Sequence, residues 1–274
     1  MNFVYKPLFD LSGKCAVVTG GLGILGQHFC RSLAEFGASV AVVDLDAEAC
    51  AEFAAALASE YPVETVGIGC DVSNPDSVQS MAARVADRLG AIHVLVNNAA
   101  SKSVDLDAFF APVEAYSAEE WRRIMSVNID GMFYVAQAVG CRMVSQGQGG
   151  SIIQVSSIYG LLASDPRIYA GSRYLGRQIN NPPVYSASKA AVCGLTRHLA
   201  AYWADHGIRV NTLAPGGVES GQNETFVRHY SARVPLGRMA RAEEMVGALI
   251  YLASDASSYV TGQDLLVDGG LSAW

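Results

Sequence analysis

The sequence contains little charge and no block of charge of one sign. Only 16% of its 274 residues are Asp, Glu, Lys or Arg, and 19 basic against 26 acidic residues give a net charge of -7. A protein that binds nucleic acid usually presents a basic patch to the phosphates. The composition therefore argues against a nucleic-acid partner.

Paired cysteines and long hydrophobic runs are absent as well. The six cysteines form no CxxC pair and no cluster with histidine, and they stand at Cys15, Cys30, Cys50, Cys70, Cys141 and Cys193. Because the cysteines are scattered along the chain, a disulfide framework or a metal site is not expected. They are interpreted as small core residues of a protein in a reducing compartment. The chain has no uncharged apolar stretch of about 18 residues, and its first residues lack the core of a signal peptide. We expect a cytoplasmic protein with no membrane partner.

What the sequence does contain is an alternation of strand-like and helix-like segments. Short β-branched runs are separated by longer Ala- and Leu-rich segments, which is typical of βαβ units. Apolar residues recur at helical spacing in the longer segments, at Leu25, Phe29, Leu33 and Phe36 and at Ala191, Leu195 and Leu199. The predicted strands are residues 15–19, 39–44, 65–70, 93–97, 151–156, 209–213 and 264–268.

We therefore predict an α/β fold: a Rossmann-like, doubly wound sheet of seven mainly parallel strands with helices on both faces. With 51% hydrophobic residues the chain can bury one large core, so a single domain over residues 1–274 is expected. In such a sheet the ligand crevice lies beyond the carboxyl ends of the strands. The motifs that follow the predicted strands are therefore the candidate site.

The first of these motifs is TGGLGILG, residues 19–26, which precedes an amphipathic helix. Gly20, Gly23 and Gly26 let the backbone turn tightly and approach a pyrophosphate, which the N–H groups and dipole of the helix N-terminus stabilise. A tight turn without a ligand would favour the same glycines. The residues around the motif must decide between the two interpretations.

Asp44, at the end of the second predicted strand, favours a dinucleotide. Its carboxylate can accept hydrogen bonds from both hydroxyls of an adenosine ribose, and it would repel a 2′-phosphate. Neither Gly21 nor Leu22 nor Leu45 supplies a cation that would offset this repulsion. NAD(H) is therefore favoured over NADP(H), with a solvated loop carboxylate as the alternative interpretation of Asp44.

Small and polar residues follow the next two predicted strands. Asp71 and Val72 come after the third strand, and Asn98, Ala99 and Ala100 come after the fourth. Asp71 can accept the adenine amino group, and the alanines leave room for a ribose. Each residue is also an ordinary turn or cap residue. At successive strand ends, they indicate one extended dinucleotide.

Two tyrosines each precede a cation by four residues: Tyr169 with Arg173, and Tyr185 with Lys189. A phenol of pKa about 10 is a poor base at neutral pH. An ammonium about 5 Å away would lower this pKa by about two units. Residues i and i+4 share one helix face, so a helix through Tyr185 would place Lys189 beside its phenol.

The sequence around Tyr169 does not support such a helix. Gly171, Gly176 and the NNPP run at 180–183 break it, and an arginine does not deprotonate in a proton relay. The segment after Tyr185 is strongly helical. Tyr185 is therefore the predicted acid–base group.

Motifs along the whole chain resemble those of the short-chain dehydrogenase/reductase family. The resemblance spans residues 11–270 and is carried by the glycine turn, NNAA (97–100), SVNIDG (126–131), QVSSIYG (154–160), YSASK (185–189), APGGVES (214–220) and GQDLLVDGG (262–270). It implies a catalytic tetrad in which Tyr185 exchanges a proton with the substrate and Ser157 binds the substrate oxygen. Lys189 would acidify the phenol and bind the nicotinamide ribose, and Asn128 would hold a water in the proton path.

The resemblance also implies a homo-oligomer, tetramer or dimer, and a mobile substrate lid over residues 217–240. Val218 would present its backbone to the nicotinamide carboxamide. The complete set of predicted cofactor contacts is Gly20, Gly23, Leu25, Gly26, Asp44, Leu45, Asp71, Val72, Asn98, Ala99, Ala100, Tyr185, Lys189, Pro215, Gly216, Val218 and Ser220.

Three features depart from the family pattern. The glycine turn is GxxGxxG, with Ile24 where a glycine is usual. The stretch at 101–117 is long, and an insertion at about 160–183 precedes the catalytic tyrosine. Long loops at the ligand edge are usually functional or disordered.

The insertion carries three arginines, Arg167, Arg173 and Arg177. A guanidinium binds a carboxylate or a phosphate well, so these arginines, with Ser157, are the candidate substrate contacts. Contacts between subunits and a merely solvated loop are the alternative interpretations.

The predicted function is an NAD(H)-dependent oxidoreductase that interconverts a secondary alcohol and a ketone on a small polar substrate, such as a sugar, a polyol or a sugar acid. The polar 217–240 segment favours this substrate class. So does a resemblance of this segment and the insertion to oxidoreductases of bacterial surface-sugar gene sets. A 3-oxoacyl-thioester reductase is the alternative among enzymes, and a non-catalytic dinucleotide-binding regulator is the alternative outside them.

Overall fold

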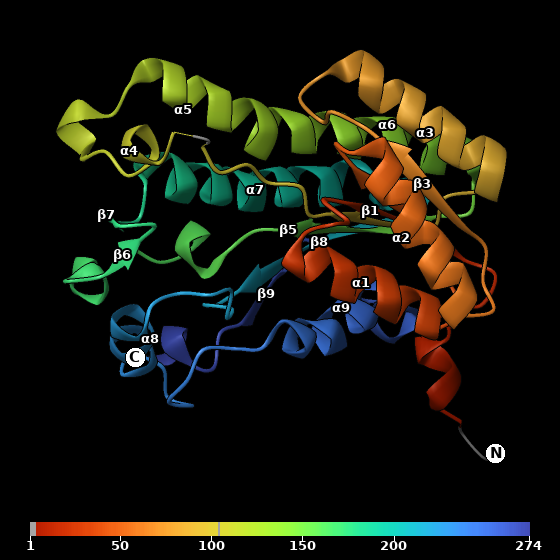
Figure 1. Ribbon diagram of the computed structural model, residues 1–274. Coiled ribbons are helices and arrows are strands. Elements are labelled where there is room, and N and C mark those ends of the chain that lie inside the picture. The colour runs from red at the N-terminus through yellow and green to blue at the C-terminus, as the bar shows by residue number, and fades with distance from the viewer. Residues whose placement is uncertain (1–3, 104) are drawn as a thin grey trace.

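Seven parallel strands form the central sheet of the computed structural model, which describes residues 4–103 and 105–274 (Figure 1). The strand order is β3-β2-β1-β4-β5-β8-β9, and every neighbouring pair is parallel. The strands are β1 (Cys15–Thr19), β2 (Ser39–Asp44), β3 (Thr65–Gly69), β4 (Val94–Asn97), β5 (Gly150–Val155), β8 (Ile208–Pro215) and β9 (Asp264–Val267). The order reverses between β1 and β4, where a doubly wound sheet opens its crevice. The predicted fold class is confirmed.

Helices cover both faces of the sheet. One face packs against α1 (Ile24–Glu35), α2 (Ala47–Glu60) and α9 (Val246–Ala253). The other packs against α3 (Pro75–Leu89), α6 (Met132–Gln146) and α7 (Pro183–Tyr202). Short 3-10 turns complete the chain at Lys6–Phe9, Val113–Ala115, Ile158–Gly160, Pro166–Tyr169, Ala204–His206, Ala242–Met245, Asp255–Ser257 and Leu271–Ala273.

Helix α7 begins earlier than the sequence pattern indicates. Pro182 is its N-cap and Pro183 its first residue, because a proline needs no N–H partner in the first turn of a helix. The NNPP run thus ends the insertion and starts α7. Ala191 is exposed, and the buried face of α7 is formed by Val184, Ser188, Lys189, Val192, Cys193, Thr196, Leu199 and Ala200. The interpretation of all six cysteines as core residues is wrong for Cys141, which is exposed.

Three irregular segments gather beyond the carboxyl end of the sheet (Figure 1). The first contains α4 (Leu106–Phe109), and the second is the insertion, with the hairpin β6 (Arg173–Tyr174) and β7 (Arg177–Gln178). Leu175 and Gly176 form the hairpin turn with φ of 47° and 80°, as a two-residue turn between antiparallel strands requires. The third is residues 217–240, which contain α8 (Glu224–Ser231).

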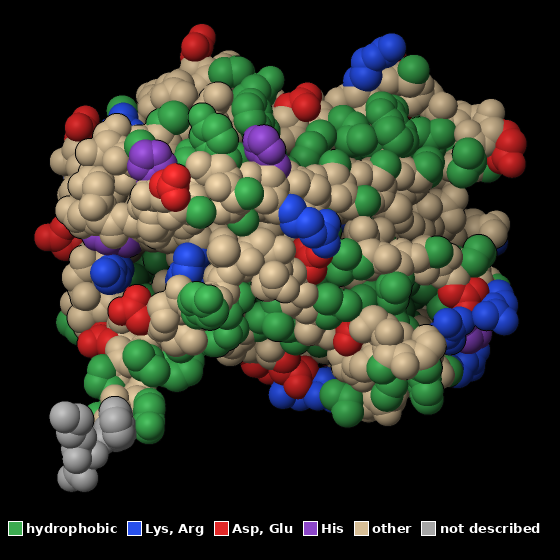
Figure 2. All heavy atoms as spheres, turned by 180° about the vertical axis from the view of Figure 1, so that it is seen from behind, with side chains coloured by type: hydrophobic (Ala, Val, Ile, Leu, Met, Phe, Trp, Pro, Cys, Tyr) green, Lys and Arg blue, Asp and Glu red, His purple; other side chains and the backbone are tan. Residues whose placement is uncertain are grey.

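Acidic and basic side chains are interspersed on the face shown in Figure 2. Within the described residues, none of the helices combines the length and the apolar character needed to cross a bilayer. The same part of the chain contains no group of three or more His, Cys, Asp or Glu placed to hold a metal ion.

Candidate active site

A cavity of about 900 Å³ lies beyond the carboxyl ends of the strands and brings most of the predicted site together. Of the predicted cofactor contacts, all but Gly26 line it, and Ser157 and Arg173 line it too. Asn128, Arg167 and Arg177 are not among its lining residues. Lys102, Gln222 and Asn223, from the two segments expected near the substrate, also line the cavity. Among the lining residues that were not predicted from the sequence are Tyr159, Asn181, Phe226 and Tyr230.

The glycine turn is too tight to accept side chains. Gly20 has φ of 64°, in the left-handed region that favours glycine. A Cβ on Gly26 would lie 2.0 Å from the carbonyl oxygen of Gly20. Helix α1 starts directly after Gly23, so its first N–H groups have no partner within the helix and could bind an anion. The space beside the turn suits a pyrophosphate. Gly26 does not line the cavity, but its lack of a Cβ lets helix α1 pack closely against Gly20.

Asp44 lies beside this turn at the end of β2. Its carboxylate accepts hydrogen bonds from the backbone N–H of Leu22 at 3.0 Å and of Leu45 at 2.8 Å. Asp71 accepts from the N–H and hydroxyl of Ser73, as a turn residue does, while it lines the cavity. Both carboxylates therefore line the part of the cavity where the sequence predicts an adenosine.

Thr19 is a residue of the cofactor end that sequence reasoning missed. Its hydroxyl accepts hydrogen bonds from the N–H groups of Asn98 (3.0 Å) and Ala99 (3.1 Å) and donates to the Asn97 side chain at 3.2 Å. The Asn98 amide in turn donates to the carbonyls of Thr19 and Gly20, each at 3.1 Å. The NNAA motif thus fixes the glycine turn. The sequence does show that Thr19 is a polar residue at the end of an apolar strand. Its hydrogen-bond partners follow β4, however, and cannot be predicted before β1 and β4 are known to be neighbours.

Ser157, Tyr185 and Lys189 meet at the floor of the cavity. Ser157 follows β5, and its hydroxyl hydrogen-bonds the phenol of Tyr185 on α7. Lys189 lies one turn further along α7, is buried, and donates from Nζ to the carbonyl of Val155 at 3.0 Å. Burial lowers the pKa of Lys189 to about 8. Its ammonium therefore titrates close to neutrality.

The expected lowering of the Tyr185 pKa is not found. Burial raises the pKa of its phenol, and the hydrogen bond with Ser157 opposes the rise only in part. The ammonium charge alone would lower the pKa of Tyr185, but desolvation disfavours any phenolate in a closed site.

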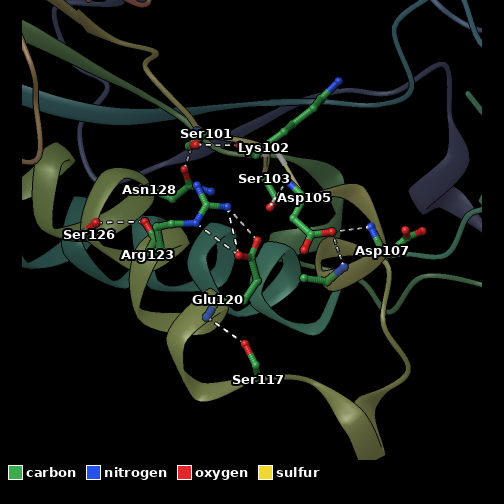
Figure 3. Close-up of polar contacts among 11 residues, drawn as sticks. Ser101, Lys102, Ser103, Asp105, Asp107, Ser117, Glu120, Arg123, Ser126 and Asn128 are labelled. Carbon is green, nitrogen blue, oxygen red and sulfur yellow. Dashed lines mark hydrogen bonds and ion pairs between the residues drawn. The ribbon is translucent and has the colours of Figure 1, made fainter.

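Asn128 does not line the cavity but contacts residues that lie next to it. It lies in a π-helical turn, Ser126–Gly131, between α5 (Ala118–Met125) and α6, and such turns are frequent at functional sites. Its Oδ1 accepts from the N–H of Ser101 at 2.8 Å (Figure 3), and its Nδ2 donates to the Ser188 hydroxyl at 3.4 Å. Ser188, also missed from the sequence, donates to the carbonyl of Tyr185 at 3.0 Å. The amide therefore links the segment after NNAA to α7.

Tyr169 lies in the same cavity but in a different setting. It ends the 3-10 turn Pro166–Tyr169, whereas Arg173 lies in the hairpin, so the helix that would align the two is absent, as predicted. The Tyr169 hydroxyl accepts from Ser164 at 3.3 Å. Burial raises the pKa of Tyr169, and the neighbouring charge of Tyr185 acts in the same direction. Tyr169 is thus a second phenol near Tyr185 without a cation of its own.

Two of the three insertion arginines bind carboxylates instead of facing the cavity. Arg167 pairs with Asp165 at 2.8 Å, its side chain is 84% exposed, and Asp165 also pairs with Arg233. Arg177 pairs with Asp107 of the 101–117 segment.

The insertion also packs against the 217–240 segment. Ile168 joins a buried apolar cluster with Phe226, Tyr230, Val234 and Met239, and the Asn223 amide donates to the Arg173 carbonyl. Tyr230 packs on Gly217, where a Cβ would lie 2.5 Å from its ring, and the Gly217 N–H donates to its hydroxyl. The insertion therefore forms one wall of the cavity with the expected lid.

A family model described as "Enoyl-(Acyl carrier protein) reductase" matches residues 23–272. The chain belongs to the short-chain dehydrogenase/reductase family. Members of this family that it resembles include a galactitol 2-dehydrogenase (L-tagatose-forming) of Cereibacter sphaeroides, 36% identical over 98% of this chain and 99% of the relative. A D-threitol dehydrogenase of Mycolicibacterium smegmatis is 36% identical over 96% of this chain and 94% of the relative.

Among solved structures of the family, the chain is similar to a gluconate 5-dehydrogenase from Burkholderia cenocepacia in complex with NADP and tartrate. The TM-score is 0.86 at 34% identity, over 97% of this chain and 98% of that chain. The protein is thus an oxidoreductase of this family with a nucleotide-binding, Rossmann-like fold.

Proposed function

We propose that this protein is an NAD(H)-dependent oxidoreductase that interconverts a secondary alcohol and a ketone on a small polyhydroxylated substrate: a sugar, polyol or sugar acid. The observation that carries the proposal is that Ser157, Tyr185 and Lys189 meet in the same cavity as the glycine turn and Asp44. The names of the galactitol and threitol relatives support this substrate class.

The dinucleotide would extend from Asp44 and the glycine turn to Lys189 and Val218. When bound, it supplies the acceptor or donor of hydride. The other work falls to residues of this chain. Tyr185 takes the hydroxyl proton during oxidation and returns it during reduction, and Ser157 hydrogen-bonds the substrate oxygen. Lys189 is charged below a pH of about 8 and lies one helical turn from Tyr185.

The substrate end of the cavity offers hydroxyl and amide groups that suit a polyhydroxylated molecule. Tyr159, Tyr169, Asn181, Gln222 and Asn223 all line it. Asp44 and the turn without cations support NAD(H) over NADP(H), although the similar Burkholderia structure contains NADP.

The test is nicotinamide absorbance with NAD+ and with NADP+, over a panel of alditols, aldonates and acyclic secondary alcohols. We expect oxidation of polyhydroxylated substrates with a higher kcat/KM for NAD+. Reduction of a 3-oxoacyl thioester with NADPH, and no oxidation in the panel, would instead support a 3-oxoacyl-thioester reductase. Tight dinucleotide binding without turnover of any substrate would support a regulator.

A further inference from the structure

The charged side chains that line the cavity are divided between its two ends. The lining carboxylates of the described chain, Asp44 and Asp71, lie at the adenosine end. Beyond the glycine turn the charged lining residues are Lys102, Arg173 and Lys189, all of them cations. Lys189 is buried at the floor, whereas Lys102 and Arg173 are exposed at the mouth. A pocket for a neutral sugar needs no cations at its mouth.

Lys102 and Arg173 come from two different segments that meet at the mouth. Lys102 follows the NNAA strand end, and its ammonium lies 5.9 Å from the ring centroid of Tyr174, the residue after Arg173 in β6. Arg173 uses one guanidinium nitrogen to donate to the Gly176 carbonyl at 2.8 Å, which fixes its stem on the hairpin. The remaining donors of both side chains are available to a ligand.

Neither cation has an ion-pair partner in the described part of the chain. The carboxylates near Lys102 in sequence are engaged elsewhere: Asp107 pairs with Arg177, and Asp105 caps α4 through the N–H groups of Asp107 and Ala108. Figure 3 shows the Lys102 side chain pointing away from Asp105 and Glu120. Two unpaired cations in one cavity wall, beside arginines that are paired, indicate a site for an anion.

We propose that Lys102 and Arg173 bind the carboxylate of a sugar acid, so that the substrate is an aldonate of five or six carbons rather than a neutral polyol. This inference rests on the proposed function and narrows it. Ser157 and Lys189 are buried, whereas both cations are exposed, so we expect the oxidised hydroxyl and the carboxylate to lie at different positions of the substrate chain. A short 2-hydroxy acid is therefore expected to be a poorer substrate.

The experiment compares D-gluconate and D-galactonate with galactitol, D-glucitol and D-glycerate, using wild type, Lys102→Gln, Arg173→Gln and Arg167→Gln. Arg167→Gln is the control, because it removes a positive charge from the insertion, as Arg173→Gln does, at a residue that does not line the cavity. We expect wild type to prefer the aldonates. Lys102→Gln and Arg173→Gln should each raise KM for aldonates about tenfold, because an exposed charge-assisted hydrogen bond is worth about 1.4 kcal/mol. KM for the alditols should change less than about twofold, and Arg167→Gln should match wild type.

A binding measurement separates this inference from the proposed function. Calorimetric titration of the protein with NADH and D-gluconate should show binding that weakens about tenfold in Lys102→Gln and Arg173→Gln and not in Arg167→Gln. Such selective binding without turnover of any alcohol would refute the proposed function and leave the carboxylate site standing. Turnover of alditols as efficient as that of aldonates, or equal losses for both in the two variants, would refute the carboxylate site and leave the function standing.

Discussion

The two ends of the cavity are built in different ways. At the cofactor end, close packing and side-chain-to-backbone hydrogen bonds fix the turn: Gly26 has no room for a Cβ, and Thr19 and Asn98 connect the turn to the end of β4. At the substrate end, ion pairs join the insertion to the 101–117 and 217–240 segments, and a small apolar cluster packs it against the latter. The difference implies that substitutions at the first end change folding and cofactor affinity, whereas those at the second change KM for the substrate.

The largest effect on turnover is expected at Tyr185, which lies between the cofactor end and the substrate end of the cavity. Tyr185→Phe should lower kcat about a thousandfold, because it removes the proton-transfer group and keeps the ring. Tyr169→Phe is the matched control, and it should stay within about fivefold of wild type because Tyr169 has no adjacent cation. Steady-state kinetics measure both. Loss of turnover only in the Tyr169 variant would reverse the assignment.

A methyl group at the glycine turn tests whether the cofactor end is rigid. Gly26→Ala should destabilise the protein by about 1–3 kcal/mol and weaken dinucleotide binding, because its Cβ overlaps the Gly20 carbonyl. Gly194→Ala is the control: Gly194 lies inside α7 with open space around its Cα, so alanine should stabilise the protein by about 0.5–1 kcal/mol. Denaturant unfolding and NADH titration would show the contrast. Unchanged binding in Gly26→Ala would argue against a tight turn.

The charge of Asp44 should decide the choice of cofactor. Asp44→Asn keeps an oxygen acceptor for the turn and removes the negative charge that repels a 2′-phosphate. The ratio of kcat/KM for NAD+ to that for NADP+ should fall about tenfold, which corresponds to about 1.4 kcal/mol of repulsion. If the ratio is unchanged in Asp44→Asn, the charge of Asp44 does not determine the preference for NAD+.

The buried Lys189 should make the free energy of unfolding depend on pH. Burial lowers its pKa from 10.5 to about 8, so between these pH values the unfolded chain binds a proton that the folded chain lacks. Stability conferred through this group should therefore rise with pH across that window, by at most about 1.4 kcal/mol per pH unit. Subtracting the unfolding free energy of Lys189→Met from that of wild type isolates this contribution. A flat difference from pH 8 to 10 would contradict the low pKa.

The smallest effect is expected from loosening the substrate end. Asp165→Asn weakens the pair with Arg233 that joins the insertion to the 217–240 segment, as well as the pair with Arg167 inside the insertion. We expect KM to rise about threefold with little change in stability, because exposed ion pairs contribute at most about 1 kcal/mol. Glu243→Gln, which breaks the exposed pair with Arg241 away from the cavity, should leave KM unchanged.

The fold and most of the cavity could be predicted from the sequence because their signals are local. Apolar runs mark the strands, and Gly20, Asp44 and Asn98 lie next to strand ends, which must meet at one edge of a parallel sheet. The partners of Thr19 and the pairing of Arg177 with Asp107 depend on contacts between distant segments. The pKa of Tyr185 was predicted in the wrong direction because burial cannot be read from the spacing of Tyr185 and Lys189.

The central claim is that an alcohol is oxidised at Tyr185 beside a dinucleotide that extends from Asp44. A crystal structure of the protein with NADH and D-gluconate tests it most directly. We predict the adenosine ribose at Asp44 and the nicotinamide ring beside Lys189, with one substrate oxygen within hydrogen-bonding distance of both Ser157 and Tyr185. A dinucleotide bound elsewhere, or a substrate oxygen bound to Tyr169 and remote from Tyr185, would contradict the account.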